Sequence, residues 1–395
     1  MAVTSLSSFA RPSPDMSTRE LLLDNARLVL PDRVVHGHLR AVGGRIEDIG
    51  EGRLRTPSAR DCDGDYLLPG LVELHTDNLE KHLLPRPGAH WPAAAAVRAH
   101  DAQLLAAGIA TALNAISVGE EEAEQAVEPQ AVLSALAQAR EDGGLRIEHA
   151  VHLRCELPYP DLPQRLQPLL EAPQLRLLSL MDHTPGQRQF HDLERYRAYS
   201  ARHGTARDDA GFGAHVRHLQ DLQRRHAAGH RRIVLAMARE RGLPLASHDD
   251  SELSHIAEAV DAGARIAEFP VNLATALAAR AAGLSVLAGA PNLVRGGSHS
   301  GNVAASELAR AGALDALSSD YVPGSLLLAA FQLGAWDSIG LPRAVAMVTH
   351  TPARAAGYDD RGALAAGQRA DLLRVRVMRG FPQLEAVWIG GERRY

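Results

Sequence analysis

The sequence predicts an α/β fold, a (β/α)8 TIM-type barrel with a small β-sandwich domain formed by both chain ends. Three observations support this prediction. The chain has 395 residues, enough for a barrel of roughly 250 residues and a second small domain. Its middle part alternates apolar runs with helical segments, whereas both ends show only short strands and turns. Hydrophobic residues make up 46% of the chain, so a large core can be buried.

The predicted barrel spans residues 67–351 and is built on eight apolar runs. Ala-rich helical segments such as AVLSALAQAR and SELSHIAEAVDAG separate several of these runs. Helices that alternate with strands in this way connect parallel neighbours, and eight such units favour a closed barrel. The expected strands are 67–77, 109–116, 147–156, 175–183, 243–248, 264–269, 284–289 and 314–319.

Residues 19–66 and 352–395 form the predicted composite β-sandwich. In LLLDNARLVL, HGHLRAVGG and RIEDIGEG, polar and apolar residues alternate, and Gly, Asp and Asn interrupt the runs. The segments ADLLRVRVMRG and QLEAVWIGGERRY have the same character, with Gly-Gly as a hairpin turn. We expect residues 1–18 to be disordered, and Met16 offers a second candidate start.

The stretch 184–242 is too long for one loop and one helix. It is rich in His and Arg, as in GQRQFHDLERYRAYSARHG and HVRHLQDLQRRHAAGHRR. We expect one or two helices that form a lid over the barrel mouth. A pair of solvated basic helices explains the same composition equally well, so both interpretations stay open.

The composition also bears on partners and location. The formal net charge of -5 argues against a general nucleic-acid binder. No window reaches the roughly 20 apolar residues of a membrane span, and the N-terminus lacks a signal-peptide pattern. Cys62 and Cys155 are the only cysteines, so a reducing, cytoplasmic location is expected and a disulfide framework is not. A homo-oligomer stays open.

Polar residues at the strand ends are informative, because reactive groups in such barrels lie at the carboxyl ends of the strands. His75 and Asp77 are two residues apart on the first strand, so both side chains point to the same side. An imidazole and a carboxylate aimed at one point form half of a site for a divalent transition metal. A buried His–Asp hydrogen bond without a metal is the alternative.

Other strands end in similar groups. The fourth ends in Asp182 and His183, and the fifth in His248 followed by Asp249 and Asp250. A lone histidine after an apolar strand is usually a packing residue, but histidines at successive strand ends favour a metal site. Asp320, after the eighth strand, can ligate the metal and take a proton from a bound water. We expect Zn²⁺ or Mn²⁺, with one or two ions per chain.

Two loops offer groups for an anion. The loop NLVRGGSHSGN exposes backbone N–H groups at its glycines and adds the side chains of Arg295, Ser298, His299 and Ser300. A plain flexible loop is the alternative. After the first strand, LEKHLLPRPG places Lys81, the only lysine, with His82 and Arg86 near the predicted mouth.

At these residues the sequence resembles the amidohydrolase superfamily, through LPGLVELHTDN, the two sandwich halves and Asp320. The motifs HTDNLEKHLLPRPG, SLMDHTPGQRQ, ASHDD, AEFP and GGSHSGNV, in this order, resemble one subgroup closely. That subgroup comprises the α-D-ribose 1-methylphosphonate 5-triphosphate diphosphatases of the carbon–phosphorus lyase pathway. The resemblance implies a metal-dependent hydrolase whose partner is a phosphorylated sugar phosphonate, cleaved to its 5-phosphate and pyrophosphate, with Asp320 as the catalytic residue.

Two departures from the superfamily pattern affect the expected ligands. The first-strand motif is usually His-x-His, but here Asp77 takes the second place. Many members bridge two metals with a lysine on strand four, where this chain has none, so Glu156 is the expected bridge if two metals are present. The predicted metal ligands are therefore His75, Asp77, Glu156, His183, His248 and Asp320, with Asp249 and Glu268 left open.

The resemblance also implies cationic or N–H partners for the leaving pyrophosphate. The candidates are Lys81, His82, Arg86, Arg188, Arg295, Ser298, His299 and Ser300. Two other functions remain. An amide, lactam or deaminating hydrolase would use the same metal site without the cationic loops. A non-catalytic barrel in a larger assembly would need no strand-end ligands.

Overall fold

The structure is a computed structural model, and it describes all residues except 1–18, 87, 120–127, 203–205 and 299. The expected disorder of 1–18 and the position of His299 therefore lie outside the described residues.

Eight parallel strands form the barrel and pair in chain order. The ring closes nearly completely, because Thr76 and Asp320 form a bridge between the first and last strands. The buried carboxylate of Glu73 crosses this seam and accepts the backbone N–H groups of His75 and Ser319. The predicted barrel is confirmed. Its strands are β6 (Leu71–Thr76), β7 (Ile109–Val118), β8 (Glu148–Glu156), β9 (Leu175–Met181), β10 (Leu245–His248), β11 (Ile266–Glu268), β12 (Ser285–Gly289) and β13 (Ala316–Ser318).

An apolar layer fills the barrel interior and supports the polar groups above it. Each strand contributes one buried side chain to this layer, and these side chains form one cluster. Side chains on a strand return to the same face every two residues, so residues two positions further along also face inward. On β8, β10 and β11 those residues are His152, His248 and Glu268. The apolar layer comprises Leu74, Leu113, Ala150, Leu177, Ala246, Ile266, Leu287 and Ala316.

Helices surround the strands and bury their apolar sides against them in two large clusters. None of the helices in the described part of the chain is both long enough and apolar enough to cross a membrane. They are α1 (Asn78–Leu83), α2 (Ala93–Ala106), α3 (Pro129–Glu141), α4 (Leu162–Leu169), α5 (Leu193–Arg202), α6 (Asp209–Arg241), α7 (Leu253–Ala262), α8 (Leu273–Ala281), α9 (Ala290–Arg295), α10 (Ala305–Arg310), α11 (Ser325–Gly334), α12 (Leu341–Ala346) and α13 (His350–Ala355), with a short 3-10 helix at Arg188–Phe190.

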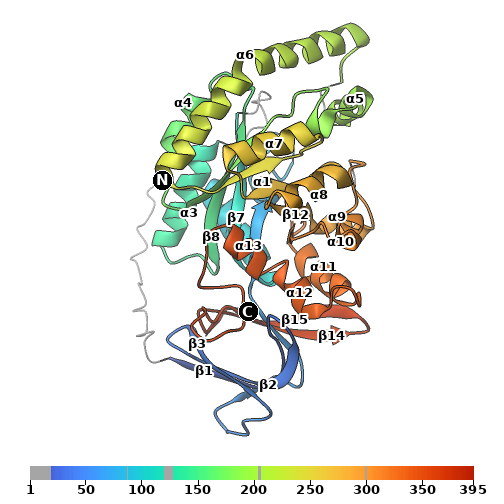
Figure 1. Cartoon of the computed structure of the whole chain (residues 1–395). Coiled ribbons are helices and arrows are strands. Elements are labelled where there is room, and N and C mark those ends of the chain that lie inside the picture. The colour runs from blue at the N-terminus through green and yellow to red at the C-terminus, as the bar shows by residue number, and fades with distance from the viewer. Residues whose placement is uncertain (1–18, 87, 120–127, 203–205, 299) are drawn as a thin grey trace, which may run out of the picture.

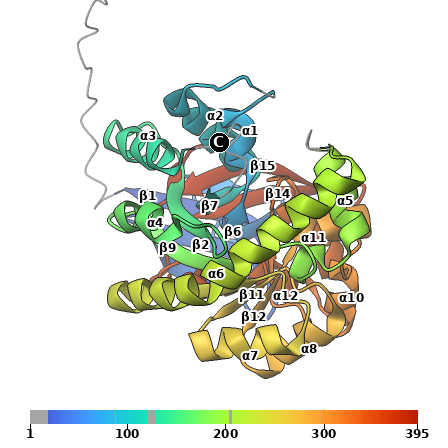
Figure 2. The same cartoon turned by 90° about the horizontal axis from the view of Figure 1, so that it is seen from above.

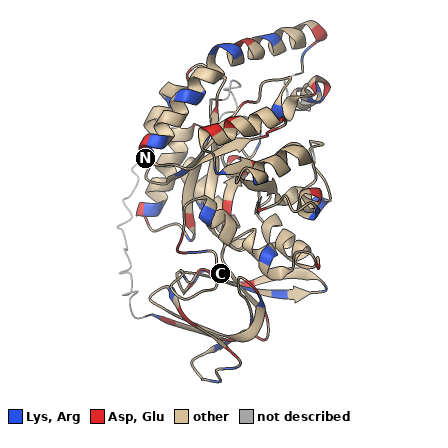
Figure 3. Ribbon diagram, viewed as in Figure 1, with Lys and Arg blue, Asp and Glu red and all other residues tan. Residues whose placement is uncertain are grey.

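The insertion 184–242 contains α5 and the 33-residue helix α6. Near its C-terminal end, α6 buries Val234 and Ala238 against the barrel helices. Nearer its start, Val216 packs with Phe190 and Tyr196 in a separate small cluster. In Figure 1 this first part extends beyond the barrel on the side to which the strand carboxyl ends point. Basic and acidic residues lie along its length (Figure 3), so the lid and the solvated helix remain alternative interpretations.

The two chain ends pair into one separate sheet, as predicted. β5 (Tyr66–Pro69) joins them, because it pairs with β14 (Leu372–Met378) on one side and β1 (Glu20–Val29) on the other. The sheet curls around one core to which Leu39 and Trp388 both contribute, although their strands are far apart in the sheet order. It lies at the amino ends of the barrel strands (Figure 1). Its other strands are β2 (Val34–Val42), β3 (Arg45–Glu51), β4 (Arg60–Asp61), β15 (Phe381–Ile389) and β16 (Glu392–Arg393).

Candidate active site

Two glutamates, Glu268 fully buried and Glu156 largely buried, orient the histidines at the carboxyl ends of the strands. Glu268 lies between His75 and His248, with one carboxylate oxygen 3.2 Å from the Nδ1 atom of each ring. Glu156 lies 2.7 Å from Nδ1 of His183 and accepts the backbone N–H of His183 with its other oxygen. A carboxylate on one ring nitrogen fixes the tautomer and leaves the other nitrogen available to a metal.

The opposite nitrogens of the same three rings face two aspartates. Nε2 of His75 lies 3.5 Å from Asp77, and Nε2 of His248 and of His183 lie 3.3 Å and 3.8 Å from Asp249. The His248 ring lies 5.6 Å from that of His75 and 5.7 Å from that of His183, measured between centroids. The fold thus brings these five side chains, four of them candidates from the sequence, to one point.

The donor set fits a divalent cation. Ligand atoms of His183, His248 and Asp249 lie within 4.8 Å of one another, and so do those of His75, His152 and Glu268. In the second group, the Nδ1 atoms of both histidines already have hydrogen-bond partners in the protein. Nε2 of His152 is buried and has no hydrogen-bond partner among the described residues. The Nε2 atoms are therefore the better candidates for metal ligation.

The electrostatics of the cluster also favour a cation. Burial lowers the pKa of His75, but the carboxylates of Glu268 and Asp77 outweigh this effect and raise that pKa to about 10. Burial raises the pKa of Asp320 to about 6, and the neighbouring charge of Asp77 adds to the shift. The carboxylates thus keep a proton on the His75 ring, and a divalent cation can take the place of that positive charge.

Asp320 lies at the seam of the barrel with a left-handed backbone, at φ 52°. Its N–H donates to the carbonyl of His75 and its own carbonyl accepts the N–H of Asp77. Asp249 and Phe269 have the same φ, and each follows the last residue of a barrel strand. Non-glycine residues rarely adopt this conformation, and such strain concentrates at functional sites.

Arg154 is a cation in this cluster that sequence reasoning missed. Its Nη1 atom lies 3.0 Å from Asp77, and its Nε atom lies 3.2 Å from the thioether sulfur of Met181. Only 12% of its side chain is exposed. The signal was present in the sequence, because Arg154 and His152 share the strand face of Glu156, two and four residues away.

The predicted anion-binding residues differ in how close they lie to the histidine–carboxylate cluster. Lys81 donates to the backbone carbonyl of Tyr321, the residue after Asp320, so it lies at the rim of the cluster. Arg188 is buried and bonds the carbonyl of His248 and the carboxylate of Asp250, so it supports the end of β10. His82 bonds Gln103 on α2 instead of facing the cluster.

The remaining candidates lie on loops or at a helix end. Arg86 is exposed after α1, and Arg295 is exposed at the end of α9. Among the described residues, neither side chain makes a hydrogen bond or ion pair with the cluster. The hydroxyls of Ser298 and Ser300 lie 2.9 Å apart, and Arg195 on α5 donates to the carbonyl of Ser300.

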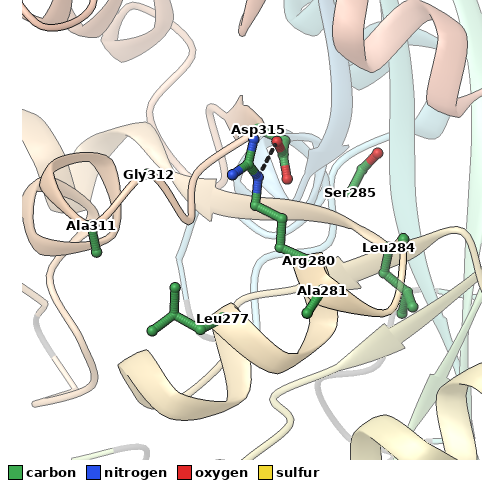
Figure 4. Close-up of a pocket in the computed structure, with 9 residues that line it drawn as sticks. Leu277, Arg280, Ala281, Leu284, Ser285, Ala311, Gly312 and Asp315 are labelled. Atoms are coloured by element: carbon green, nitrogen blue, oxygen red, sulfur yellow. Dashed lines mark hydrogen bonds and ion pairs between the residues drawn. The ribbon is translucent and has the colours of Figure 1, made fainter.

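A separate hollow of about 520 Å³ is lined by residues of α8, the start of β12 and the loop before β13 (Figure 4). Two of its lining residues directly precede barrel strands: Leu284 precedes β12, and Asp315 precedes β13. It is therefore at the amino ends of the strands, the face that serves stability in such barrels. Its Arg280 is paired with Asp315 at 3.1 Å, and the hollow contributes nothing to the cluster.

Comparison with known proteins decides the family. No family model matches the chain. The chain is 43% identical over 378 residues to the alpha-D-ribose 1-methylphosphonate 5-triphosphate diphosphatase of Escherichia coli (strain K12), covering 94% of this chain and 100% of that protein. The chain belongs to this diphosphatase family.

Solved structures show the fold of this diphosphatase family member to be that of amidohydrolases. An amidohydrolase crystal structure matches with a TM-score of 0.62 at 16% identity, covering 95% of this chain and 98% of that one. The 5-methylcytosine deaminase from Klebsiella pneumoniae matches with 0.63 at 15% identity over 95% and 98%. The N-acetyl-D-glucosamine-6-phosphate deacetylase from Mycobacterium smegmatis matches with 0.59 at 16% identity over 95% and 100%.

Proposed function

We propose that this chain is a metal-dependent hydrolase that cleaves α-D-ribose 1-methylphosphonate 5-triphosphate to the 5-phosphate and pyrophosphate, in phosphonate catabolism. The observation that carries the proposal is the 43% identity to a diphosphatase of that name across 94% of this chain. The buried histidine–carboxylate cluster at the barrel mouth supports it. Both cysteines are buried and unpaired, in keeping with the proposed cytoplasmic location.

The proposed metal is Zn²⁺ or Mn²⁺, in one or two copies. His75, Asp77, His183, His248 and Asp320 would hold it, joined by Asp249. When bound, a divalent ion supplies Lewis-acid chemistry that acidifies water and neutralises phosphoryl charge. Glu268 keeps the rings of His75 and His248 turned toward that ion, and Glu156 does the same for His183. A bridging role for Glu156 remains the alternative.

In this proposal the chain's own groups orient the water and the substrate. Asp320 would accept the proton of the attacking water, as a carboxylate at the carboxyl end of the last barrel strand. The water oxygen forms a bond to the α phosphorus, and the bond from that phosphorus to the bridging oxygen breaks. The electron pair leaves on pyrophosphate. Lys81 at the rim would bind the outer phosphates.

The decisive experiment is turnover of the triphosphate in ¹⁸O-labelled water, followed by phosphorus NMR. Attack at the α phosphorus puts the label into the 5-phosphate and leaves the pyrophosphate unlabelled. Label in pyrophosphate would move the attack to the β phosphorus, and stepwise release of orthophosphate would contradict the proposed reaction. Turnover of cyclic amides without cleavage of the triphosphate would instead favour an amide hydrolase.

A further inference from the structure

We propose that Arg154 binds the phosphoryl group that is attacked, as a fixed guanidinium inside the barrel mouth. This inference rests on the proposed function, because it assigns a residue to the α-phosphate of the same substrate. Nothing in the subgroup motifs that identify the chain points to this strand position, since the motifs in ASHDD, AEFP and SLMDHTPGQRQ lie on other strands.

The position of Arg154 on β8 directs its side chain into the barrel. It lies between His152 and Glu156 on the same strand face, and both of those residues belong to the buried cluster. A strand presents every second residue to one face, so the three side chains rise in order toward the mouth. Arg154 therefore stands between a buried histidine below and the glutamate that orients His183 above.

The contacts of Arg154 bring it to the ligand side of the cluster. It reaches from β8 to Asp77 at the end of β6, at 3.0 Å. Asp77 in turn lies 3.5 Å from Nε2 of His75, on the nitrogen that we assign to the metal. The guanidinium is thus separated from the proposed metal position by a single carboxylate. A phosphoryl group that reaches the metal also comes within reach of Arg154.

The chemistry of the guanidinium suits this task. A planar guanidinium presents its N–H groups in a fork that matches two phosphate oxygens. The Nε–H of Arg154 meets the thioether sulfur of Met181, which is a weak acceptor. A phosphoryl oxygen is a far better acceptor, so its replacement of the sulfur gives a stronger hydrogen bond. The surrounding acids also need such a cation, because a polyanionic substrate would otherwise approach Asp77, Asp249 and Asp320.

A purely structural role, in which Arg154 only neutralises Asp77, makes a different prediction. Loss of the guanidinium would then alter metal content or folding, but would leave the affinity of the metal-loaded protein for anions unchanged. The test therefore measures anion binding at equal metal content. Inorganic phosphate is the probe, because it carries the phosphoryl group without the rest of the substrate.

We would compare the wild type with Arg154→Met and Arg154→Lys, and use Arg176→Met as the control. Arg176 is also on a barrel strand, but it is exposed at the amino end of β9. Calorimetry on the metal-loaded proteins should show phosphate binding weakened roughly 10- to 100-fold in Arg154→Met, the loss expected for a charge-assisted hydrogen bond. Arg154→Lys should lose less, and Arg176→Met should match the wild type.

The rate of triphosphate turnover is the second measurement. Arg154→Met should lower kcat for the triphosphate by about 10²–10³-fold, as removal of one transition-state donor does. Arg154→Gly should regain part of this rate when guanidinium is added. Unchanged phosphate affinity in Arg154→Met at full metal content would overturn the inference. If the wild type binds phosphate through Arg154 but does not cleave the triphosphate, the proposed function fails while the anion site stands.

Discussion

At the scale of single residues, the site lies where non-glycine residues adopt a left-handed backbone conformation. Asp249 and Phe269 are left-handed, and each donates its N–H to a carbonyl of the next strand in the barrel. Asp320 does the same across the seam. The left-handed turn thus continues the hydrogen-bond ladder for one more residue while it redirects the chain. The surrounding ladder holds these conformations, and Asp249 and Asp320 are two of the carboxylates that we propose as metal ligands.

Asp320→Asn should make the metal-free protein more stable at pH 8. The folded-state pKa of Asp320 is raised to about 6 by burial and by Asp77, from an ordinary value of 3.8. A raised pKa stabilises the fold fully only below the ordinary value, and this contribution is lost as the pH rises through about 6. The ionised carboxylate therefore costs up to about 3 kcal/mol at pH 8, and the amide removes that cost.

Urea unfolding of chelator-treated protein at pH 4 and pH 8 checks this. The variant should gain stability relative to the wild type mainly at pH 8, while activity with metal is lost. Asn also tolerates the left-handed backbone, so strain should not obscure the result. An equal difference at the two pH values would show that Asp320 does not carry the shift.

Glu156→Gln should weaken metal binding without removing a metal. Both oxygens of Glu156 are bonded to His183, so we expect it to orient that ring. Loss of such a partner typically lowers metal affinity by about 10–100-fold. Metal titration followed by elemental analysis distinguishes the two roles. Full stoichiometry at saturation supports orientation, whereas loss of one equivalent would support the bridge predicted from the sequence.

At the scale of elements, a chain of buried polar groups anchors α1 to the barrel. Asn78, the first residue of α1, donates to His100 on α2, which donates to Asn114 on β7. Asn114 donates to His149, and His149 donates to Asp101. Burial lowers the pKa of His100 to about 3, so its ring is neutral and can accept from Asn78. This series of hydrogen bonds thereby fixes the position of Asn78 and of Asp77 next to it.

Asn114→Leu should destabilise the protein and also lower turnover. The substitution leaves the buried rings of His100 and His149 without their partner, at about 1–3 kcal/mol for each unpaired group. The effect should reach the site because Asp77 adjoins Asn78. Ser117→Ala is the matched control on the same strand, since the Ser117 hydroxyl is buried with no hydrogen-bond partner among the described residues. Chemical unfolding and kcat that are equally unaffected in both variants would disprove the anchoring role.

The sequence predicts the secondary-structure elements better than it predicts the contacts between side chains. Each barrel strand lies within a predicted apolar run, because periodicity and helix spacing are local properties. The prediction of the first run, 67–77, as one strand is wrong: its residues 67–69 belong to β5 of the sheet formed by the chain ends, and the barrel strand β6 begins at Leu71. The convergence of His75, His183 and His248 also followed, since parallel strands end on one face. The partners of those rings did not follow. Glu268 contacts His75 across 193 positions of sequence, and Arg154 meets Asp77 across 77. The alternation of side chains along a strand shows which residues face the barrel interior, but it does not show which of them contact one another.

At the scale of the whole molecule, the proposed ligands come from strands on opposite sides of the ring. His75 and Asp320 lie at the seam between β6 and β13, whereas His183 follows β9 and His248 is the last residue of β10. A bound ion would therefore tie the carboxyl ends of distant strands together. The sheet formed by the two chain ends has its own core at the other end of the barrel. Metal binding should stabilise the two regions to different degrees.

Removal of the metal should thus loosen one end of the molecule selectively. An ion that binds only the folded state stabilises it by about 4 kcal/mol at a free concentration a thousand times its Kd. Hydrogen exchange followed by mass spectrometry, with and without a chelator, checks where this is lost. Peptides covering the ends of β6, β9, β10 and β13 should exchange faster without metal, while β14 and β15 should keep their protection as the internal control. Equal loss in both regions would mean that the ion stabilises the fold as one cooperative unit, and no change anywhere would contradict a metal held by these strand ends.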